Sequence, residues 1–67
     1  MSAYVTEFFA AAAAATGGVI RRKESDVDRV GALPEILQEA RDRGWHVIRT
    51  GDQIVVLCHP GEVNILC

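Results

Sequence analysis

The stretch WHVIRTGDQIVVLCHPGEVNILC, residues 45–67, decides the fold of this chain. It contains three runs rich in β-branched and aliphatic residues, 45–50, 53–59 and 62–67, separated by the dipeptides Gly51-Asp52 and Pro60-Gly61. A two-residue loop with Gly first is typical of a tight hairpin, and Pro followed by Gly suits the centre of a type II turn. The stretch therefore predicts a three-stranded antiparallel meander.

Because side chains alternate along a strand, the two turns determine which residues share a face of this sheet. With residue 50 opposite 53 and residue 59 opposite 62, one face is almost continuously apolar: Trp45, Val47, Arg49, Ile54, Val56, Cys58, Val63, Ile65 and Cys67. The opposite face still carries four large aliphatic side chains: Ile48, Val55, Leu57 and Leu66. A solvated sheet face is normally polar, so we expect something to cover both faces.

A helix is predicted over residues 33–43, immediately before the meander. Pro34 suits a first helical turn and Gly44 suits a helix end. Leu33, Ile36, Leu37 and Ala40 fall on one side of this helix. We place that side on the first face of the sheet, where Trp45 would close one end of the core.

The N-terminal part predicts a second helix over residues 3–15, which is rich in alanine, the best helix former. Ser2 can cap its start, and Gly17-Gly18 can end it. Residues 19–24, VIRRKE, are a candidate edge strand, because Lys and Arg discourage further pairing at an edge. Residues 25–31 are expected to be a polar connector.

These elements predict a single small α+β domain over residues 1–67: an N-terminal helix, a candidate edge strand, a second helix and a three-stranded antiparallel meander packed on the helices. A chain of 67 residues buries only about 60% of its unfolded surface. Its core is therefore small, and domains of this size commonly need a staple or a partner.

Three occupants are candidates for the second sheet face: the N-terminal helix through Tyr4, Phe8 and Phe9, a second copy in a homodimer, or a foreign protein. A helix swapped between two copies would combine the first two. The predicted protein-interface residues are Ile48, Val55, Leu57, Leu66, Phe8 and Phe9.

The composition indicates which classes of partner, and which cellular compartment, are to be expected. Seven basic and nine acidic residues give a net charge of −2, which argues against a dedicated nucleic-acid-binding protein. The run FFAAAAAAT lacks the basic flank of a signal peptide and is too short to span a bilayer. With two cysteines, too few for a disulfide framework, we expect a cytoplasmic protein with no membrane contact. The Arg- and Ala-rich composition is typical of bacterial or phage genomes rich in GC.

Residues capable of chemistry are few. His46 and His59 share the second face as diagonal neighbours, but zinc needs about four ligands and Cys58 points to the other face. Cys58 is expected to be a core residue and Cys67 an exposed one. No phosphate-binding loop or catalytic triad is present. We therefore expect neither catalysis nor a cofactor.

Residues 33–67 are similar in layout to the small HicA/YcfA-like toxins, which have a double-stranded-RNA-binding-domain-like fold. Gly44-Trp45, Arg49 and Gly51 carry the resemblance. In that family the catalytic histidine follows Gly-Ser, whereas Asp52-Gln53 occupy this place here, and the family helix after the last strand has no counterpart before Cys67. The resemblance implies the fold and a link to nucleic acid, but not ribonuclease activity.

The sequence thus predicts a non-enzymatic module that binds, and possibly inhibits, another protein, as a homodimer or on a host protein. The docking surface would be the second sheet face or an acidic helical surface that includes Glu35, Glu39 and Asp42. The alternative is a nucleic-acid-binding module, because Arg21, Arg22 and Lys23 form a basic run to which Arg49 would add.

Overall fold

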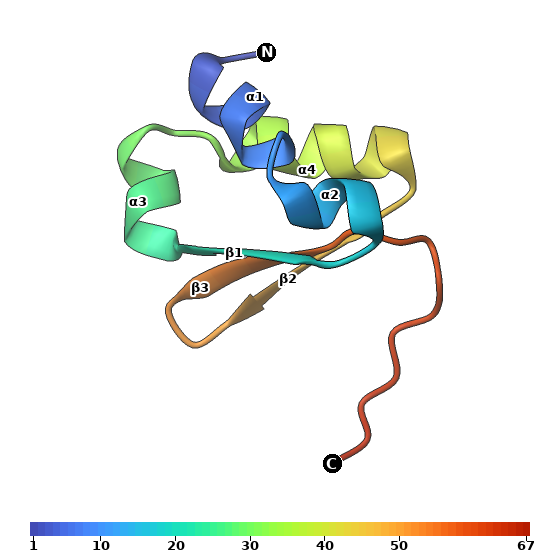
Figure 1. Cartoon of the computed structure of the whole chain (residues 1–67). Helices are drawn as coiled ribbons and strands as arrows, with labels where there is room; N and C mark the ends of the chain where they lie inside the picture. Colours follow the sequence, from blue (N-terminus) through green and yellow to red (C-terminus); the bar gives the residue numbers. More distant parts are fainter.

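The computed structural model describes residues 1–67 and confirms a small α+β fold with a three-stranded antiparallel sheet packed against helices. Helices α1 and α4 cover one face of the sheet, while α2 and α3 flank the two ends of β1 (Figure 1). The elements in chain order are α1 (Ala3–Phe9), α2 (Ala12–Thr16), β1 (Val19–Lys23), α3 (Glu24–Arg29), α4 (Leu33–Arg43), β2 (His46–Thr50) and β3 (Gln53–Leu57).

The β2–β3 hairpin is formed as the sequence predicts. Thr50 lies opposite Gln53, so the predicted division of β2 and β3 residues between the two faces is confirmed. Gly51 has φ of 56° and no non-glycine residue has positive φ, which agrees with a two-residue turn that places Gly first.

The third strand is not the predicted one. The sheet order is β1-β3-β2, so the candidate edge strand is confirmed over Val19–Lys23, where it pairs with β3, whereas Glu24 begins helix α3. Residues 62–67 form no strand, because β1 and β2 already occupy both edges of β3. Gly61 does not have positive φ, so Pro60-Gly61 do not form the predicted type II turn.

Helix α4 begins and ends as predicted. Pro34 lies in its first turn, and Gly44 ends it in the left-handed conformation with φ of 73°. The N–H groups of Gly44 and Trp45 both donate to the carbonyl oxygen of Ala40, which closes the last turn.

The predicted helix over residues 3–15 is instead two short helices that meet at Ala10 and Ala11. Ala11 is extended, with ψ of 146°, and this bend directs the chain toward β1. Helix α1 buries Val5, Phe8 and Phe9, whereas α2 buries no residue. Alanine side chains supply too little apolar area to hold one straight helix on the core.

Residues 24–29 also differ from the prediction, because they form helix α3 in place of a polar connector. Its first turn carries Glu24 and Asp26 and its last turn Arg29, which matches the helix dipole. Val27 is fully buried and fixes α3 to the core.

The core lies entirely between the sheet and the helices. Val5, Phe8 and Phe9 of α1 belong to the same cluster as Ile36 of α4 and Val56 of β3. The candidate placement of the N-terminal helix on the second sheet face is therefore wrong: α1 lies on the same face as α4. Trp45 closes one end of this core as predicted, half-buried and stacked on Phe9 with ring centroids 6.2 Å apart.

Candidate protein-interaction surface

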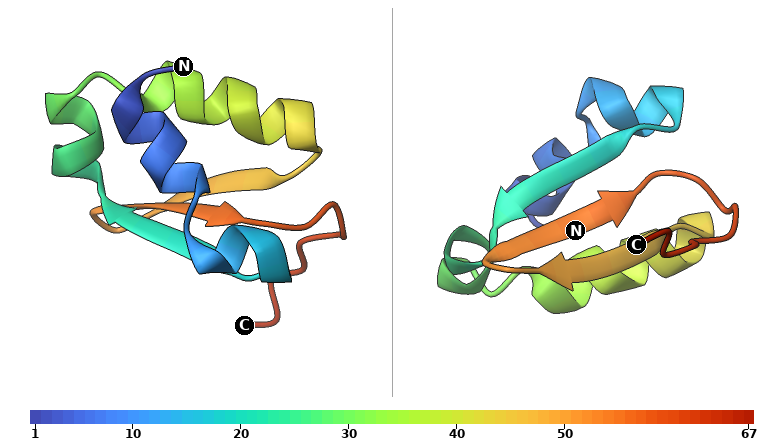
Figure 2. Two further views of the ribbon diagram at one scale, coloured as in Figure 1. Left: turned by 45° about the horizontal axis from the view of Figure 1, so that its top comes forward. Right: turned by 90° about the horizontal axis from the view of Figure 1, so that it is seen from below.

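The sheet face away from the helices, here called the outer face, receives alternate residues of all three strands. The view from below in Figure 2 shows the strands in front, with no helix over them. The register puts Arg21, Val55 and Ile48 in one row across the sheet. The neighbouring rows are Val19, Leu57 and His46, and Lys23, Gln53 and Thr50.

The outer face is apolar at its centre. Val55 is only 5% exposed, because it lies on the central strand between the side chains of Arg21 and Ile48. Ile48 and Val19 are 40% and 49% exposed on either side of the central strand, and Leu57 is half-buried. Five of the seven exposed large hydrophobic residues lie on this face or on the segment that follows β3: Val19, Ile48, Val63, Ile65 and Leu66.

The structure brings together part of the predicted interface. Ile48, Val55 and Leu57 are neighbours on the outer face, and Leu66 is 94% exposed on the segment that extends below the sheet (Figure 1). Phe8 and Phe9 are 2% and 5% exposed in the core, so they offer no surface to a partner. Val19 was not among the predicted interface residues, because the local sequence pattern does not show which strand residues 19–23 pair with.

The histidines hold the start of the C-terminal segment. Nε2 of His46 donates to the carbonyl oxygen of Gly61 at 2.7 Å, and Nδ1 of His59 accepts from the Gly61 N–H at 3.1 Å. Their rings are 6.2 Å apart, and no group of three or more His, Cys, Asp and Glu residues is placed to hold a metal ion. The histidines thus anchor backbone at one corner of the outer face.

The basic residues of the predicted nucleic-acid site are divided between the two faces. Arg21 and Lys23 lie on the outer face, whereas Arg22 lies on the inner face with its guanidinium 5.5 Å from the Phe8 ring centroid. Arg49 is on the far edge strand and forms an ion pair with Glu24. A hollow of about 250 Å³ is lined by Arg21, Arg22, Lys23 and Gln53.

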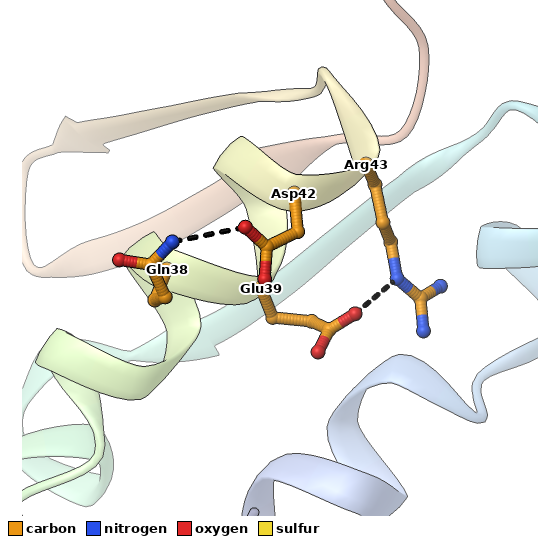
Figure 3. Close-up of polar contacts among 4 residues, drawn as sticks. All are labelled: Gln38, Glu39, Asp42 and Arg43. Carbon is orange, nitrogen blue, oxygen red and sulfur yellow. Dashed lines mark hydrogen bonds and ion pairs between the residues drawn. The ribbon is translucent and has the colours of Figure 1, made fainter.

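The acidic helical surface is largely paired within the chain. Glu39 accepts from Arg43 at 2.8 Å and Asp42 accepts from Gln38 at 2.9 Å, both along α4 (Figure 3). Glu35 accepts from the backbone N–H of Ser2 at 2.9 Å. A basic partner would have to compete with these contacts, so the outer face is the stronger candidate for docking.

The two thiols differ in environment. Cys58 is 3% exposed in the core, as predicted, and Cys67 is exposed. Burial raises the pKa of the Cys58 thiol, although the charge of Arg43 and a backbone contact from Ile20 act in the opposite direction. Thiolate is the reactive form, so Cys58 is poorly suited to nucleophilic chemistry.

Comparison of the chain with models of protein families, with curated proteins and with solved structures found no match. The resemblance of residues 33–67 to the HicA/YcfA-like toxins therefore stays a prediction. None of the helices combines the length and apolar character needed to cross a membrane.

Proposed function

We propose that this chain is a non-enzymatic protein-binding module whose outer sheet face docks onto another protein. One observation carries the proposal: all helices pack on the opposite side, so no helix covers Ile48 and Leu57, which stay partly exposed beside the shielded Val55. Antiparallel sheets that face water are normally polar on that side, and contiguous exposed apolar patches commonly mark interaction sites.

The edge of the outer face indicates the kind of partner. Arg21 and Lys23 line it on the β1 side, and no acidic side chain of the three strands points to this face. An apolar partner surface with acidic residues at its rim would match it, because complementary rim charges speed association and align the partners. Occupying a functional surface of that partner would inhibit it.

The side chains best suited to chemistry are engaged elsewhere, which supports binding over catalysis. His46 and His59 both hydrogen bond to Gly61, and the Cys58 thiol lies in the core. Neither arrangement leaves a nucleophile beside a free base at the outer face.

Photo-crosslinking in the cell that makes the protein tests the proposal. A photoreactive side chain replaces Ile48 in one variant and Gln38, exposed on α4, in a matched control. We expect a discrete adduct to a protein other than a second copy of this chain, and from position 48 only. Equal adducts at both positions, or none at position 48, would contradict docking on the outer face.

Nucleic-acid binding is the second candidate function, favoured by the polar hollow lined by Arg21, Arg22 and Lys23. It predicts nuclease-sensitive adducts at position 48 and an affinity that falls steeply as salt is raised, because phosphate contacts release counterions. An apolar protein interface predicts weak salt dependence, which separates the two functions.

A further inference from the structure

The two edges of the sheet differ in their openness to another strand. Strand β1 carries Arg21, Arg22 and Lys23, and charged residues of this kind discourage pairing at an edge. Strand β2 pairs only with β3, has no bulge or proline, and its one charged residue, Arg49, is held by Glu24. The free edge of β2 is therefore the one suited to strand addition.

An apolar groove runs along this free edge. Two hollows of about 400 Å³ and about 210 Å³ adjoin each other between α4 and β2, because both are lined by Leu37, Val47 and Ile48. Leu33 extends this lining at one end and Trp45 at the other. We call this feature the α4–β2 groove.

The segment Glu62–Cys67, here called the tail, has the properties of an unpaired strand. None of its backbone N–H and C=O groups takes part in a backbone hydrogen bond of the chain. Val63, Ile65 and Leu66 are 43%, 84% and 94% exposed. Val63 already lines the Trp45 end of the α4–β2 groove, which shows that side chains of the tail fit there.

We propose that the tail of one copy adds as a strand to the free edge of β2 in a second copy, with its apolar side chains in the α4–β2 groove. The exchange is reciprocal and forms a two-fold homodimer. In strand addition of this kind, main-chain hydrogen bonds give affinity. Pockets that accept every second side chain of the added strand give specificity.

The alternation of the tail agrees with this arrangement. Val63, Ile65 and Cys67 point to one side of an extended segment, and Asn64 and Leu66 to the other. An antiparallel register with Ile65 opposite Val47 directs the first set into the groove. Asn64 then lies opposite Ile48, and Leu66 opposite His46, at the rim of the outer face.

The area of contact is sufficient for a stable dimer. An extended segment of six residues exposes about 950 Å², at about 1.45 Å² per dalton of unfolded chain. Burying about half of this area and a similar area of groove, in two reciprocal contacts, removes about 1,900 Å² from water. Specific, stable interfaces bury roughly 1,200–2,000 Å².

The path of the chain favours insertion of the tail into the groove of a second copy rather than into the groove of its own copy. The tail leaves β3 beside His46, so within one copy it would run parallel to β2, and parallel pairing is slightly weaker than antiparallel pairing. Beyond Val63 the tail extends away from its own sheet (Figure 1). The inference goes beyond the proposed function and does not depend on it: Ile48 borders both surfaces, but the exchange needs Leu37 and Val47, which lie on the helix side of the sheet.

Mass in solution, measured by sedimentation equilibrium over a range of concentrations, tests the exchange. We expect twice the 7.3 kDa of one chain for the wild type and the single-chain mass for Ile65→Asp, because an aspartate cannot enter the apolar groove. Asn64→Asp is the matched control: it adds the same charge one residue earlier, on the side away from the groove, and should remain a dimer.

A synthetic peptide of residues 61–67 then tests the groove directly. Added to the Ile65→Asp protein, it should shift the amide resonances of β2 and α4 selectively. A monomeric wild type whose stability falls in Ile65→Asp would mean that the tail occupies its own groove, and would overturn the proposal. A dimer that survives Ile65→Asp, or peptide shifts elsewhere, would overturn it equally.

Discussion

Val55 and Val56 are adjacent in the chain and both are buried, but they belong to different surfaces. Val56 is fully buried in the core under the helices, whereas Val55 points to the outer face and is shielded by Arg21 and Ile48. The sequence alone could assign these faces, because the Gly51-Asp52 turn sets the register of β2 and β3. It could not reveal how Val55 is shielded, since that depends on the pairing of a strand more than thirty residues earlier.

Cys58 gives a prediction at this scale. Burial raises its thiol pKa above the ordinary value of 9.0, so the folded state favours the neutral thiol. The corresponding contribution to stability is complete at pH values below the unfolded pKa and is lost as pH rises through the folded pKa. The wild type should therefore lose stability relative to Cys58→Ala as pH rises from 8 to above 9, measured by urea denaturation. A difference between the two proteins that stays constant over this range would contradict the assignment.

At the scale of elements, the structure confirms the helix and the hairpin that residues within them or beside them predict. Helix α4 and the β2–β3 hairpin follow from Pro34, Gly44 and Gly51, which act within a few residues of themselves. The break at Ala11 and the choice of β1 over the tail as third strand are tertiary outcomes. They depend on the burial of Phe8 and Phe9 in the core and on the long-range pairing of β1 with β3.

Gly44 tests the link between α4 and β2. Its φ of 73° strains any other residue, whereas the nearest atom to an added Cβ, in Pro60, is 4.0 Å away and is no obstacle. Gly44→Ala should therefore lower the free energy of unfolding by about 1 kcal/mol through backbone strain alone. Gly44→Asn is the control: asparagine tolerates the left-handed conformation better than alanine and should lose less stability at the same position. Equal effects of the two substitutions would show that the left-handed helix end is not the cause.

At the scale of the whole molecule, the arrangement is a sheet covered on one side only. The sequence predicted apolar residues on both faces, and the structure confirms this division for β2 and β3. It did not predict that every helix would pack on the same face, because both faces carry large apolar side chains and the pattern does not say which helix covers which face. The consequence is that the outer face and the tail retain most of the exposed large hydrophobic residues.

The most direct measurement of this central claim compares Ile48→Asp with Ile54→Asp by urea denaturation at one low protein concentration. Ile54 is 2% exposed under the helices and Ile48 is 40% exposed on the outer face. We predict that Ile54→Asp loses about 4 kcal/mol or more and unfolds this small domain, whereas Ile48→Asp stays folded within about 1 kcal/mol of the wild type. Equal destabilisation by the two substitutions would mean that the outer face is covered within the chain, and would contradict the account.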